Sequence, residues 1–407
     1  MNIIIQKFGG TSVATKELRE KVAKKVILSK QEGKIPVVVV SAIGRSGDPY
    51  ATDTLIGLAN HAFKEQSSRE LDMIMACGEI ISAVIMANTI KATGYDAVAL
   101  TGFQAGIITD EYHGDAEVTR VDCEPILSLL KEGKIPVVTG FQGATLTGDI
   151  TTLGRGGSDT TAALLGEALE ADVVEIYTDV DGVMTADPRL VPEAKVIDTI
   201  CYDEIYQMAE DGAKVVHPRA VEIARRGNIT LKIKNTFSDA PGTIINGKIG
   251  SKGNSYRSGN EGDLLTAIAH KNGITQFTVF FNGDSVEESE RFMNELTDNH
   301  ISIDLINFFT DRKVFTVEEK NVEKLEQILN KLEYKFQVAK DCSKITAIGH
   351  KIRGVPGVMA RIVKALAGQG VKILQSSDSH TTISCLVSRK DMEKAVNALH
   401  QEFNLSR

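Results

Sequence analysis

The stretch Lys7-Phe8-Gly9-Gly10-Thr11-Ser12-Val13 stands directly after an apolar run at 3–6 and directly before a segment with apolar residues at helical spacing. Two adjacent glycines let backbone N–H groups approach an anion closely, the helix N-terminus adds partial positive charge, and the lysine adds a full charge. This combination suits the phosphates of a nucleotide. An isolated Gly-Gly turn is more often a plain connection, so the interpretation depends on the rest of the chain.

The pattern around this stretch predicts the fold class of the first 245 residues. Short β-branched runs alternate there with segments of helical period. The runs lie at 3–6, 37–40, 97–101, 137–139, 173–177 and 230–233. This alternation is typical of an α/β fold with a mostly parallel sheet covered by helices on both faces.

Two further turns are dense in polar groups. The segment 151–161 carries Gly154-Arg155-Gly156-Gly157-Ser158-Asp159 and opens onto a predicted helix. It joins a guanidinium, bare backbone, a hydroxyl and a carboxylate in one turn, which a simple connection does not require. The segment 177–189 follows a predicted strand and lacks the acidic ligands of a calcium loop. We interpret it as a nucleotide-edge loop.

Other binding motifs are absent from the sequence. The closest match to a phosphate-binding Walker loop, 242–248, is followed by Ile249 instead of Ser or Thr. There is no Gly-x-Gly-x-x-Gly fingerprint of a dinucleotide-binding domain. The eight histidines have no paired ligand spacing, so a zinc site is not expected.

The composition excludes several partners. The 407 residues carry 46 basic and 54 acidic side chains, which gives a net charge of −8 and no basic footprint for nucleic acid or anionic lipid. No apolar stretch reaches the roughly 20 residues that cross a bilayer, and no secretory signal is visible. Five scattered cysteines do not form a disulfide framework. We therefore expect a cytoplasmic protein with no nucleic-acid or membrane partner.

The amino-acid composition changes near residue 246. The segment 246–263 is rich in Gly, Ser and Asn and is the predicted linker. Beyond it, two βαβ patterns follow, one at 274–281, 286–299 and 301–308, the other at 346–349, 358–369 and 371–375. The domains predicted are 1–245, catalytic, and two smaller domains at 264–340 and 341–407.

Four ordered motifs make the chain similar to the aspartokinases of the amino acid kinase family. They are the 7–13 stretch, 154–159, 177–189 and Gly212-Ala213-Lys214-Val215-Val216-His217-Pro218-Arg219-Ala220. The tail, with 354–358, resembles the paired ACT regulatory domains of these enzymes. The segments 47–53 and 374–382 look most like the diaminopimelate-sensitive type of spore-forming Gram-positive bacteria. The resemblance implies a three-layer αβα sandwich followed by two ferredoxin-like βαββαβ ACT domains, and in the family C-terminal residues can complete the first of them.

The resemblance also implies the reaction, which is phosphorylation of the aspartate side chain by ATP with Mg²⁺ carried on the nucleotide. Catalytic roles fall on Lys7, Asp159 and Lys214. The implied ATP-binding residues are Lys7, Phe8, Gly9, Gly10, Thr178, Asp179, Met184, Arg189 and Lys214. The implied substrate-binding residues are Ser41, Thr52, Glu79, Arg155, Gly156, Gly157 and Ser158. No protein side chain is predicted to bind the metal.

The resemblance further implies feedback inhibition by an end-product amino acid, with diaminopimelate first and lysine or threonine as alternatives, and at least a homodimer formed through the ACT domains. The implied effector residues are Val355, Pro356, Gly357, Val358, Gln375, Ser376, Ser377 and Asp378. Two other functions stay open at this point. One is an amino-acid sensor without turnover, and the other is a kinase of glutamate or its acetyl derivative.

Overall fold

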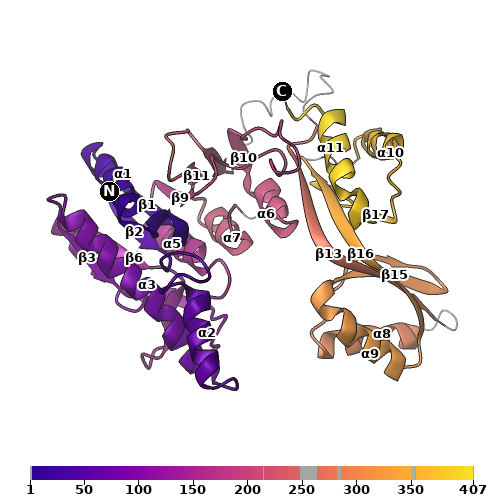
Figure 1. Ribbon diagram of the computed structural model, residues 1–407, viewed down its shortest axis with the longest axis horizontal. Helices are drawn as coiled ribbons and strands as arrows, with labels where there is room; N and C mark the ends of the chain where they lie inside the picture. Colours follow the sequence, from indigo (N-terminus) through magenta and orange to yellow (C-terminus); the bar gives the residue numbers. More distant parts are fainter. Residues whose placement is uncertain are drawn as a thin grey trace. The chain divides into compact units, whose positions relative to one another are not determined.

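The computed structural model describes residues 2–213, 215–247, 264–281, 286–350, 352 and 354–406. They divide into two compact units (Figure 1). The first unit contains the described residues of 2–183, 196–209 and 215–247, and the second those of 184–195, 210–213 and 264–406. The predicted linker lies outside the described residues from position 248 to its end.

The first unit is built on a sheet that is parallel except where β11 pairs with β12. Its strands are rich in Val and Ile, which favour a pleated, buried surface. Among the described residues their order is β10 (Thr199–Cys201), β12 (Thr243–Asn246), β11 (Leu231–Asn235), β9 (Val173–Thr178), β1 (Ile3–Phe8), β2 (Ile35–Val40), β6 (Ile135–Thr139) and β3 (Ala97–Leu100).

Helices cover this sheet. On one face, α1 (Lys16–Gln31) and α3 (Ser68–Lys91) bury Val22, Val26, Met86 and Ile90 in a core shared with β1 and β2. In the same unit, α5 (Gly157–Ala168) contacts β1 and β9 and packs against α7 (Pro218–Arg226). The remaining helices are α2 (Thr52–Ala62), α4 (Glu124–Lys131) and α6 (Tyr202–Glu210). The predicted α/β class with a mostly parallel sheet is confirmed.

A small second sheet in this unit has the order β5 (Val118–Val121), β4 (Ile107–Thr109), β7 (Gln142–Ala144) and β8 (Ile150–Thr152). Strand β8 contacts α3 and leads directly into the polar turn before α5. The small sheet therefore positions one of the two glycine-rich turns that the sequence singles out.

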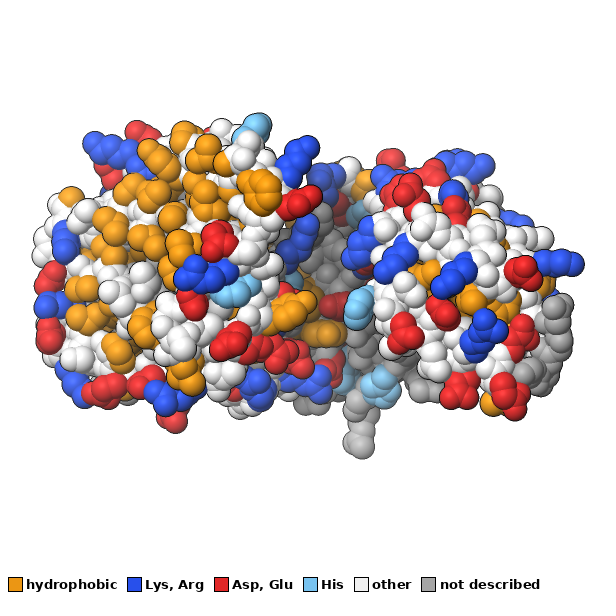
Figure 2. All heavy atoms as spheres, turned by 90° about the horizontal axis from the view of Figure 1, so that it is seen from below, with side chains coloured by type: hydrophobic (Ala, Val, Ile, Leu, Met, Phe, Trp, Pro, Cys, Tyr) orange, Lys and Arg blue, Asp and Glu red, His pale blue; other side chains and the backbone are white. Residues whose placement is uncertain are grey.

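Helix α3 is more apolar than the sequence analysis allowed for. It is the one helix within the described ranges that is long and apolar enough to cross a membrane by length and composition, with 44% of its most apolar window buried. Its buried side packs on the large sheet, whereas Met73 and Val84 on the other side are exposed. Leu58 of α2 and Phe63, the residue after α2, are exposed as well. Figure 2 shows hydrophobic side chains gathered on the first unit, on the side where α2 and α3 lie in Figure 1.

The second unit contains one continuous antiparallel sheet. Its strand order is β14 (Asp304–Phe308), β15 (Arg312–Glu318), β13 (Ala267–Phe280), β16 (Lys335–Ile348), β18 (Thr382–Ser388) and β17 (Gln375–Asp378). Four helices accompany the described part of it, namely α8 (Val286–Asp298), α9 (Val322–Lys331), α10 (Val358–Gly368) and α11 (Met392–Glu402). The strand predicted at 371–375 begins only at Gln375, because the backbone N–H of Val371 still donates to the carbonyl oxygen of Leu366 in α10 at 3.0 Å.

The sheet resolves into two βαββαβ halves that share β13 and β16. Residues 274–280 of β13 pair with 335–339 and 342 of β16 and belong with α8, β14, β15 and α9. Residues 267–271 pair with 344–348, and these residues of β16 belong with α10, β17, β18 and α11. The predicted boundary between 340 and 341 thus falls inside β16. The resemblance led us to expect that C-terminal residues complete the first half. In the structure, the N-terminal part of β13 instead completes the C-terminal half.

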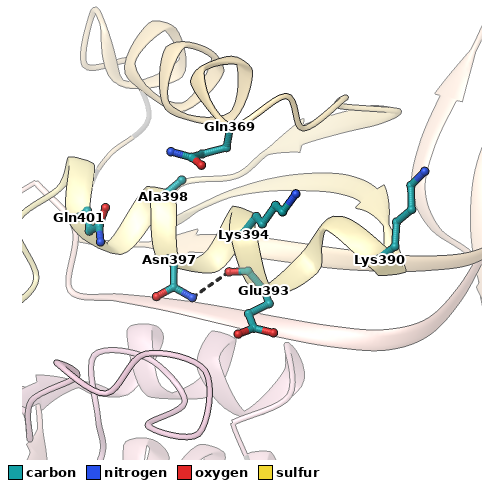
Figure 3. A pocket seen from close by; sticks show the side chains of 7 residues that line it. All are labelled: Gln369, Lys390, Glu393, Lys394, Asn397, Ala398 and Gln401. Atoms are coloured by element: carbon teal, nitrogen blue, oxygen red, sulfur yellow. Dashed lines mark hydrogen bonds between the residues drawn. The ribbon is translucent and has the colours of Figure 1, made fainter.

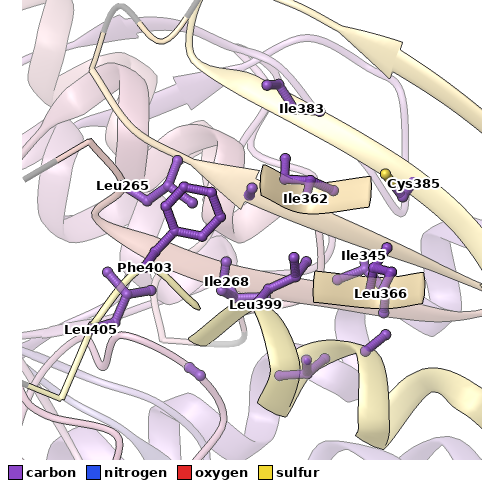
Figure 4. Packing of buried hydrophobic residues seen from close by; sticks show 14 of the residues in the cluster. Leu265, Ile268, Ile345, Ile362, Leu366, Ile383, Cys385, Leu399, Phe403 and Leu405 are labelled. Atoms are coloured by element: carbon purple, nitrogen blue, oxygen red, sulfur yellow. The ribbon is translucent and has the colours of Figure 1, made fainter. Parts of the chain in front are cut away.

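Two segments of the predicted domain 1–245, residues 184–195 and 210–213, belong to the second unit. Ala186 and Val191 join the core that contains Ile268 and Leu399, part of which Figure 4 displays. Thr185 Oγ1 lies 2.9 Å from His400 Nε2, and both residues are buried.

The segment 210–213 is joined to the second unit by charge. Lys344 Nζ lies 2.6 Å from carboxylate oxygens of both Asp211 and Asp304, and the side chains of Lys344 and Asp211 are 11% and 6% exposed. The adjacent Gly212 has φ +108°, and a Cβ there would lie 2.2 Å from the carbonyl oxygen of His270. Both segments are therefore fixed to the second unit by contacts within that unit.

Candidate active site

An ion pair between β1 and α5 marks the candidate site. Lys7 Nζ lies 2.7 Å from Asp159 Oδ1, and both side chains are 13% exposed. Phe8 is buried in the core with α1 and α3, so alternation along the strand directs Lys7 to the opposite face of the sheet. Asp159 Oδ2 also accepts a hydrogen bond from the backbone N–H of His217 at 3.3 Å. The lysine is therefore fixed by a carboxylate that is itself held in place.

A cavity of about 280 Å³ opens beside this pair. Its lining comes from segments far apart in the sequence. It consists of Lys7, Ser41, Thr52, Glu79, Phe141, Gly154, Arg155, Gly156, Gly157, Ser158 and Asp159. The structure thus brings together Lys7 and Asp159 with all seven residues predicted to bind the substrate.

Glu79 of α3 places a buried carboxylate in this cavity. Glu79 is 3% exposed, and its Oε1 accepts a hydrogen bond from the backbone N–H of Ala42 at 3.0 Å. Oε2 is buried and has no hydrogen-bond partner among the described residues. Burial raises the pKa of the Glu79 carboxyl to about 8, although the Ala42 N–H opposes this shift. An ammonium group entering the cavity would satisfy the unpaired oxygen.

Arg155 supplies the complementary charge. It is exposed, and within the described part of the chain its guanidinium makes no hydrogen bond or ion pair. The neighbouring glycines, Gly154 and Gly156, have φ +68° and +69°, and a Cβ on Gly156 would lie 2.1 Å from Cγ of His217. Only glycine fits that position. Ser41 and Ser158 close the same side with an Oγ–Oγ hydrogen bond of 3.0 Å.

The first glycine-rich turn is packed against the chain after β2. A Cβ on Gly10 would lie 2.4 Å from the carbonyl oxygen of Ala42, so this position also requires glycine. Below the turn, the ring of Phe8 stacks on Tyr177 with centroids 4.6 Å apart. Phe8 is fully buried, so only its backbone remains available for a nucleotide. Gly9 and Gly10 are partly exposed.

The other predicted nucleotide residues are more scattered. Thr178 ends β9, and Asp179 lies 3.1 Å from Arg45. Met184 and Arg189 belong to the second unit, where Arg189 is bound to Asp187. Lys214 lies outside the described residues. The nucleotide roles of these residues stay predictions.

Two cavity residues were missed by the sequence analysis. Gly154 was quoted in the motif but given no role, and Phe141 was not singled out. Phe141 has φ +70°, which is rare for a bulky side chain and often marks a functional position. A Cβ on Gly157 would approach its ring to 2.8 Å. No local sequence signal predicts this contact, because it joins a strand end to a helix start.

The predicted effector residues occupy two elements of the second unit. Val355, Pro356 and Gly357 form an exposed turn before α10, whereas Val358 is buried in the core. Ser376, Ser377 and Asp378 are exposed on β17. Gln375 is buried, and its amide groups bond Asn307 and Gln276 at 2.6 and 2.8 Å.

The second unit also has a larger hollow of about 440 Å³ (Figure 3). It lies along α11 and is lined by Gln369, Lys390, Glu393, Lys394, Asn397, Ala398 and Gln401. None of the predicted effector residues lines it. Within the described ranges, no group of three His, Cys, Asp or Glu side chains is arranged to hold a metal ion.

Comparisons with known proteins agree with this geometry. A model of the amino acid kinase family matches residues 2–235, and a model of the ACT domain matches residues 337–401. Aspartokinase 1 of Bacillus subtilis is 44% identical over 407 residues, covering 100% of both chains. The aspartokinase of Geobacillus stearothermophilus is 39% identical over 412 residues, covering 100% of this chain and 98% of its own.

Solved structures give the same answer. Escherichia coli aspartokinase III in complex with aspartate and ADP has a TM-score of 0.79 and 25% identity, and the match covers 98% of this chain and 99% of that chain. The same enzyme with lysine and aspartate has a TM-score of 0.76, 25% identity, and covers 99% and 100%. The match therefore extends through both units, and the predicted ACT region is confirmed. The chain belongs to the amino acid kinase family, as an aspartokinase with a C-terminal ACT domain.

Proposed function

We propose that this chain transfers the γ-phosphoryl group of ATP to the side-chain carboxylate of L-aspartate, the first step toward lysine, diaminopimelate, threonine and methionine. One observation carries the proposal. A single cavity holds the carboxyl group of Glu79 and the guanidinium of Arg155, and an ammonium group, that of Lys7, held by the carboxylate of Asp159. Among the described residues, neither Oε2 of Glu79 nor the guanidinium of Arg155 has a hydrogen-bond partner. Aspartate carries an ammonium and two carboxylates, which are the complementary set of charges.

The reaction needs no general base in this site. The aspartate side chain, with a pKa of about 4, is ionised at neutral pH and attacks as a carboxylate. A carboxylate oxygen forms the bond to the γ-phosphorus, the bond to the bridging β–γ oxygen breaks, and ADP leaves with that electron pair. The obstacle is repulsion between two anions. Lys7 reduces this repulsion, and Asp159 holds the lysine without accepting a proton.

The α-groups of aspartate are assigned to opposite charges. Glu79 Oε2 receives the ammonium, and Arg155 binds the α-carboxylate. Ser41, Thr52 and Ser158 provide neutral hydrogen-bonding groups, and Gly156 and Gly157 allow close approach of the backbone. This division accounts for the buried Oε2 of Glu79, which has no partner within the described part of the chain, since the substrate itself would complete the pair.

The nucleotide is assigned to the turn at 7–10 together with Thr178, Asp179, Met184, Arg189 and Lys214. The partial exposure of Gly9 and Gly10 supports this assignment, because neither residue has a side chain that would keep an anion away from the backbone of the turn. Mg²⁺ bound to the β- and γ-oxygens would neutralise charge that develops during transfer. The nucleotide brings this ion, and no side chain is assigned to it.

Feedback regulation is proposed at the ACT halves, with diaminopimelate as the inhibitor and a homodimer as the smallest assembly. Support comes from the high identity to Bacillus subtilis aspartokinase 1 and from the lysine complex of Escherichia coli aspartokinase III. The exposed turn at 355–357 and the exposed edge strand at 376–378 provide backbone groups for a zwitterion. Edge strands β14 and β17 are available for pairing with a second copy.

We also propose that the catalytic domain ends near 245 and that the regulatory region begins near 264, within a cytoplasmic protein. The cysteines are free, and four of the five are buried, which suits a reducing compartment.

Aspartate-dependent formation of an acyl hydroxamate, with ATP and Mg²⁺, tests the activity. Glutamate and N-acetylglutamate serve as substrate controls, and lysine, threonine and diaminopimelate are added separately as inhibitors. Turnover with aspartate, and none with glutamate or N-acetylglutamate, supports the proposal. Binding of amino acids without turnover would indicate a sensor, and preference for a glutamate derivative would assign the chain to another branch of the family.

A further inference from the structure

The turn 153–156 places Arg155 at the cavity, but the side chain of Arg155 does not stabilise the conformation of the turn. Within the described residues its guanidinium makes no hydrogen bond or ion pair, and Gly154 and Gly156 on either side have left-handed backbone angles. Such a turn has many alternative conformations unless other groups constrain it. Since a misplacement of about 1 Å at a substrate-binding group can cost about 100-fold in rate, those constraints matter for function.

Arg219 of α7 provides one constraint. Its Nη1 donates to the carbonyl oxygen of Leu153 at 3.3 Å, and its Nη2 donates to that of Ala116 at 3.2 Å. The same guanidinium lies 3.6 Å from Asp115 Oδ1. A Cβ on Gly154 would lie 2.4 Å from that oxygen, so the turn and the loop 113–116 are in direct contact. Arg219 therefore joins the start of the turn to the loop beside it.

Asp72 of α3 provides the second constraint. It is fully buried, and Oδ2 accepts hydrogen bonds from His113 Nδ1 at 2.9 Å and from the backbone N–H groups of Gly114 and Thr152 at 3.0 Å each. Oδ1 accepts a further bond from the Thr152 hydroxyl. Asp72 thus holds the same loop and the residue that precedes the turn.

Helix α3 connects these constraints to the substrate. Glu79 lies seven residues after Asp72, which is two helical turns along the same face. One helix therefore positions the acid assigned to the ammonium and, through Asp72, the strand end that leads to Arg155. Arg219 completes the connection from α7.

We propose that Arg219 and Asp72 are positioning residues that set the place of the Arg155 guanidinium relative to Glu79. They fix the span between the two groups that bind the α-carboxylate and α-ammonium of the substrate. The inference rests on the proposed role of Arg155. It adds two residues outside the cavity lining to the determinants of substrate affinity.

The test compares Arg219→Gln, Arg219→Lys and Arg155→Gln in the full-length protein, with KM for aspartate, KM for ATP and kcat measured for each. The matched control is Arg226→Gln on the same helix, whose guanidinium pairs with Glu167 at the surface. We expect Arg219→Gln to raise KM for aspartate about tenfold and KM for ATP less than about twofold. Arg219→Lys, with a single ammonium for two carbonyls, should lie between Arg219→Gln and the wild type.

A double-mutant cycle separates positioning from general stabilisation. If Arg219 acts through Arg155, adding Arg219→Gln to Arg155→Gln changes KM for aspartate by less than about twofold. A lower melting temperature with both KM values unchanged overturns the inference. If Arg219→Gln does not fold, Arg219→Lys decides by the same ratio of KM values. A normal KM for aspartate in Arg155→Gln overturns the proposed role of Arg155 as well, whereas an effect there without one at Arg219 overturns only the positioning.

Discussion

Lys7 Nζ and Asp159 Oδ1 lie 2.7 Å apart, although the two residues come from a strand and a helix separated by most of the catalytic unit. The pair places one full positive charge where β1 ends and a second glycine-rich turn begins. Since both side chains are 13% exposed, each depends on the other for a charged partner. The geometry therefore makes the orientation of Lys7 sensitive to any change at Asp159.

Replacing Lys7 by Met removes the charge that offsets repulsion between the reactants. We expect kcat to fall by about 100- to 1,000-fold, as for the loss of one preorganised electrostatic contact. Asp159→Asn should also lower kcat, by less, because the lysine remains but is no longer held by a charge. Steady-state kinetics with a folded-state check by circular dichroism measures both. Normal turnover by a folded Lys7→Met variant would contradict the assigned role.

Glu79 should give the activity a pH dependence. Burial raises the pKa of Glu79 to about 8, and only the ionised form can pair with the substrate ammonium. Below pH 8 the free protein is mostly protonated at this group, so kcat/KM for aspartate should fall about tenfold per pH unit there. The profile should level off above pH 8.

The control for this profile is Glu79→Gln, which should have a high KM for aspartate at every pH and no titration near 8. The same raised pKa has a consequence for stability. Between the unfolded pKa of about 4.3 and the folded value of about 8, the folded state binds more protons at this group, so its contribution to stability declines as pH rises. Glu79→Gln should remove that slope in thermal unfolding measured from pH 5 to 9.

Two glycines with positive φ, one packed against a neighbouring side chain and one in open space, provide a matched comparison. Gly156→Ala places a Cβ 2.1 Å from Cγ of His217, whereas Gly148→Ala, with φ +91°, meets nothing within 4 Å. Both changes strain the backbone, by about 1–2 kcal/mol, but only the first displaces the substrate turn. We expect similar losses of stability from strain and a loss of kcat/KM for aspartate only in Gly156→Ala. Equal kinetics in both variants would show that the contact with His217 is dispensable.

Lys344→Met should destabilise the second unit. It leaves the buried carboxylate of Asp211 without its partner, which typically costs about 3–5 kcal/mol. Lys271→Met is the control, because the Lys271–Glu318 pair is 34% and 40% exposed and should contribute at most about 1 kcal/mol. Thermal unfolding measures both. Since Asp211 precedes Lys214 by three residues, inhibition curves with the effector should also change in Lys344→Met and not in the control.

Local chemistry explains what could be predicted from the sequence. The Gly-Gly turn after β1 and the Gly154–Ser158 turn are encoded in adjacent residues, and the alternation of β-branched and helical segments indicates a parallel sheet without long-range information. Seven residues of the cavity could be predicted as one group because the resemblance to the family assigned them to substrate binding, and in the structure they line one cavity.

Long-range pairing explains what could not be predicted. Nothing local indicates that Phe141 would adopt φ +70° against Gly157, or that Asp72 would bind a loop forty residues later. The segment 177–189 was interpreted as a nucleotide-edge loop, but Ala186 within it and Val191 just after it pack in the core of the second unit. Register across β13 and β16 likewise depends on distant strands.

The shared strand β13 constrains how the regulatory region could be produced as a separate polypeptide. A fragment starting after Phe280 would retain α10, β17, β18 and α11 but leave one side of β16 with open backbone donors and acceptors along 335–348. Such an edge invites strand exchange with another copy. An internal translation start or an engineered cut would therefore have to lie upstream of Ala267 to yield a fragment in which β16 keeps both of its neighbouring strands.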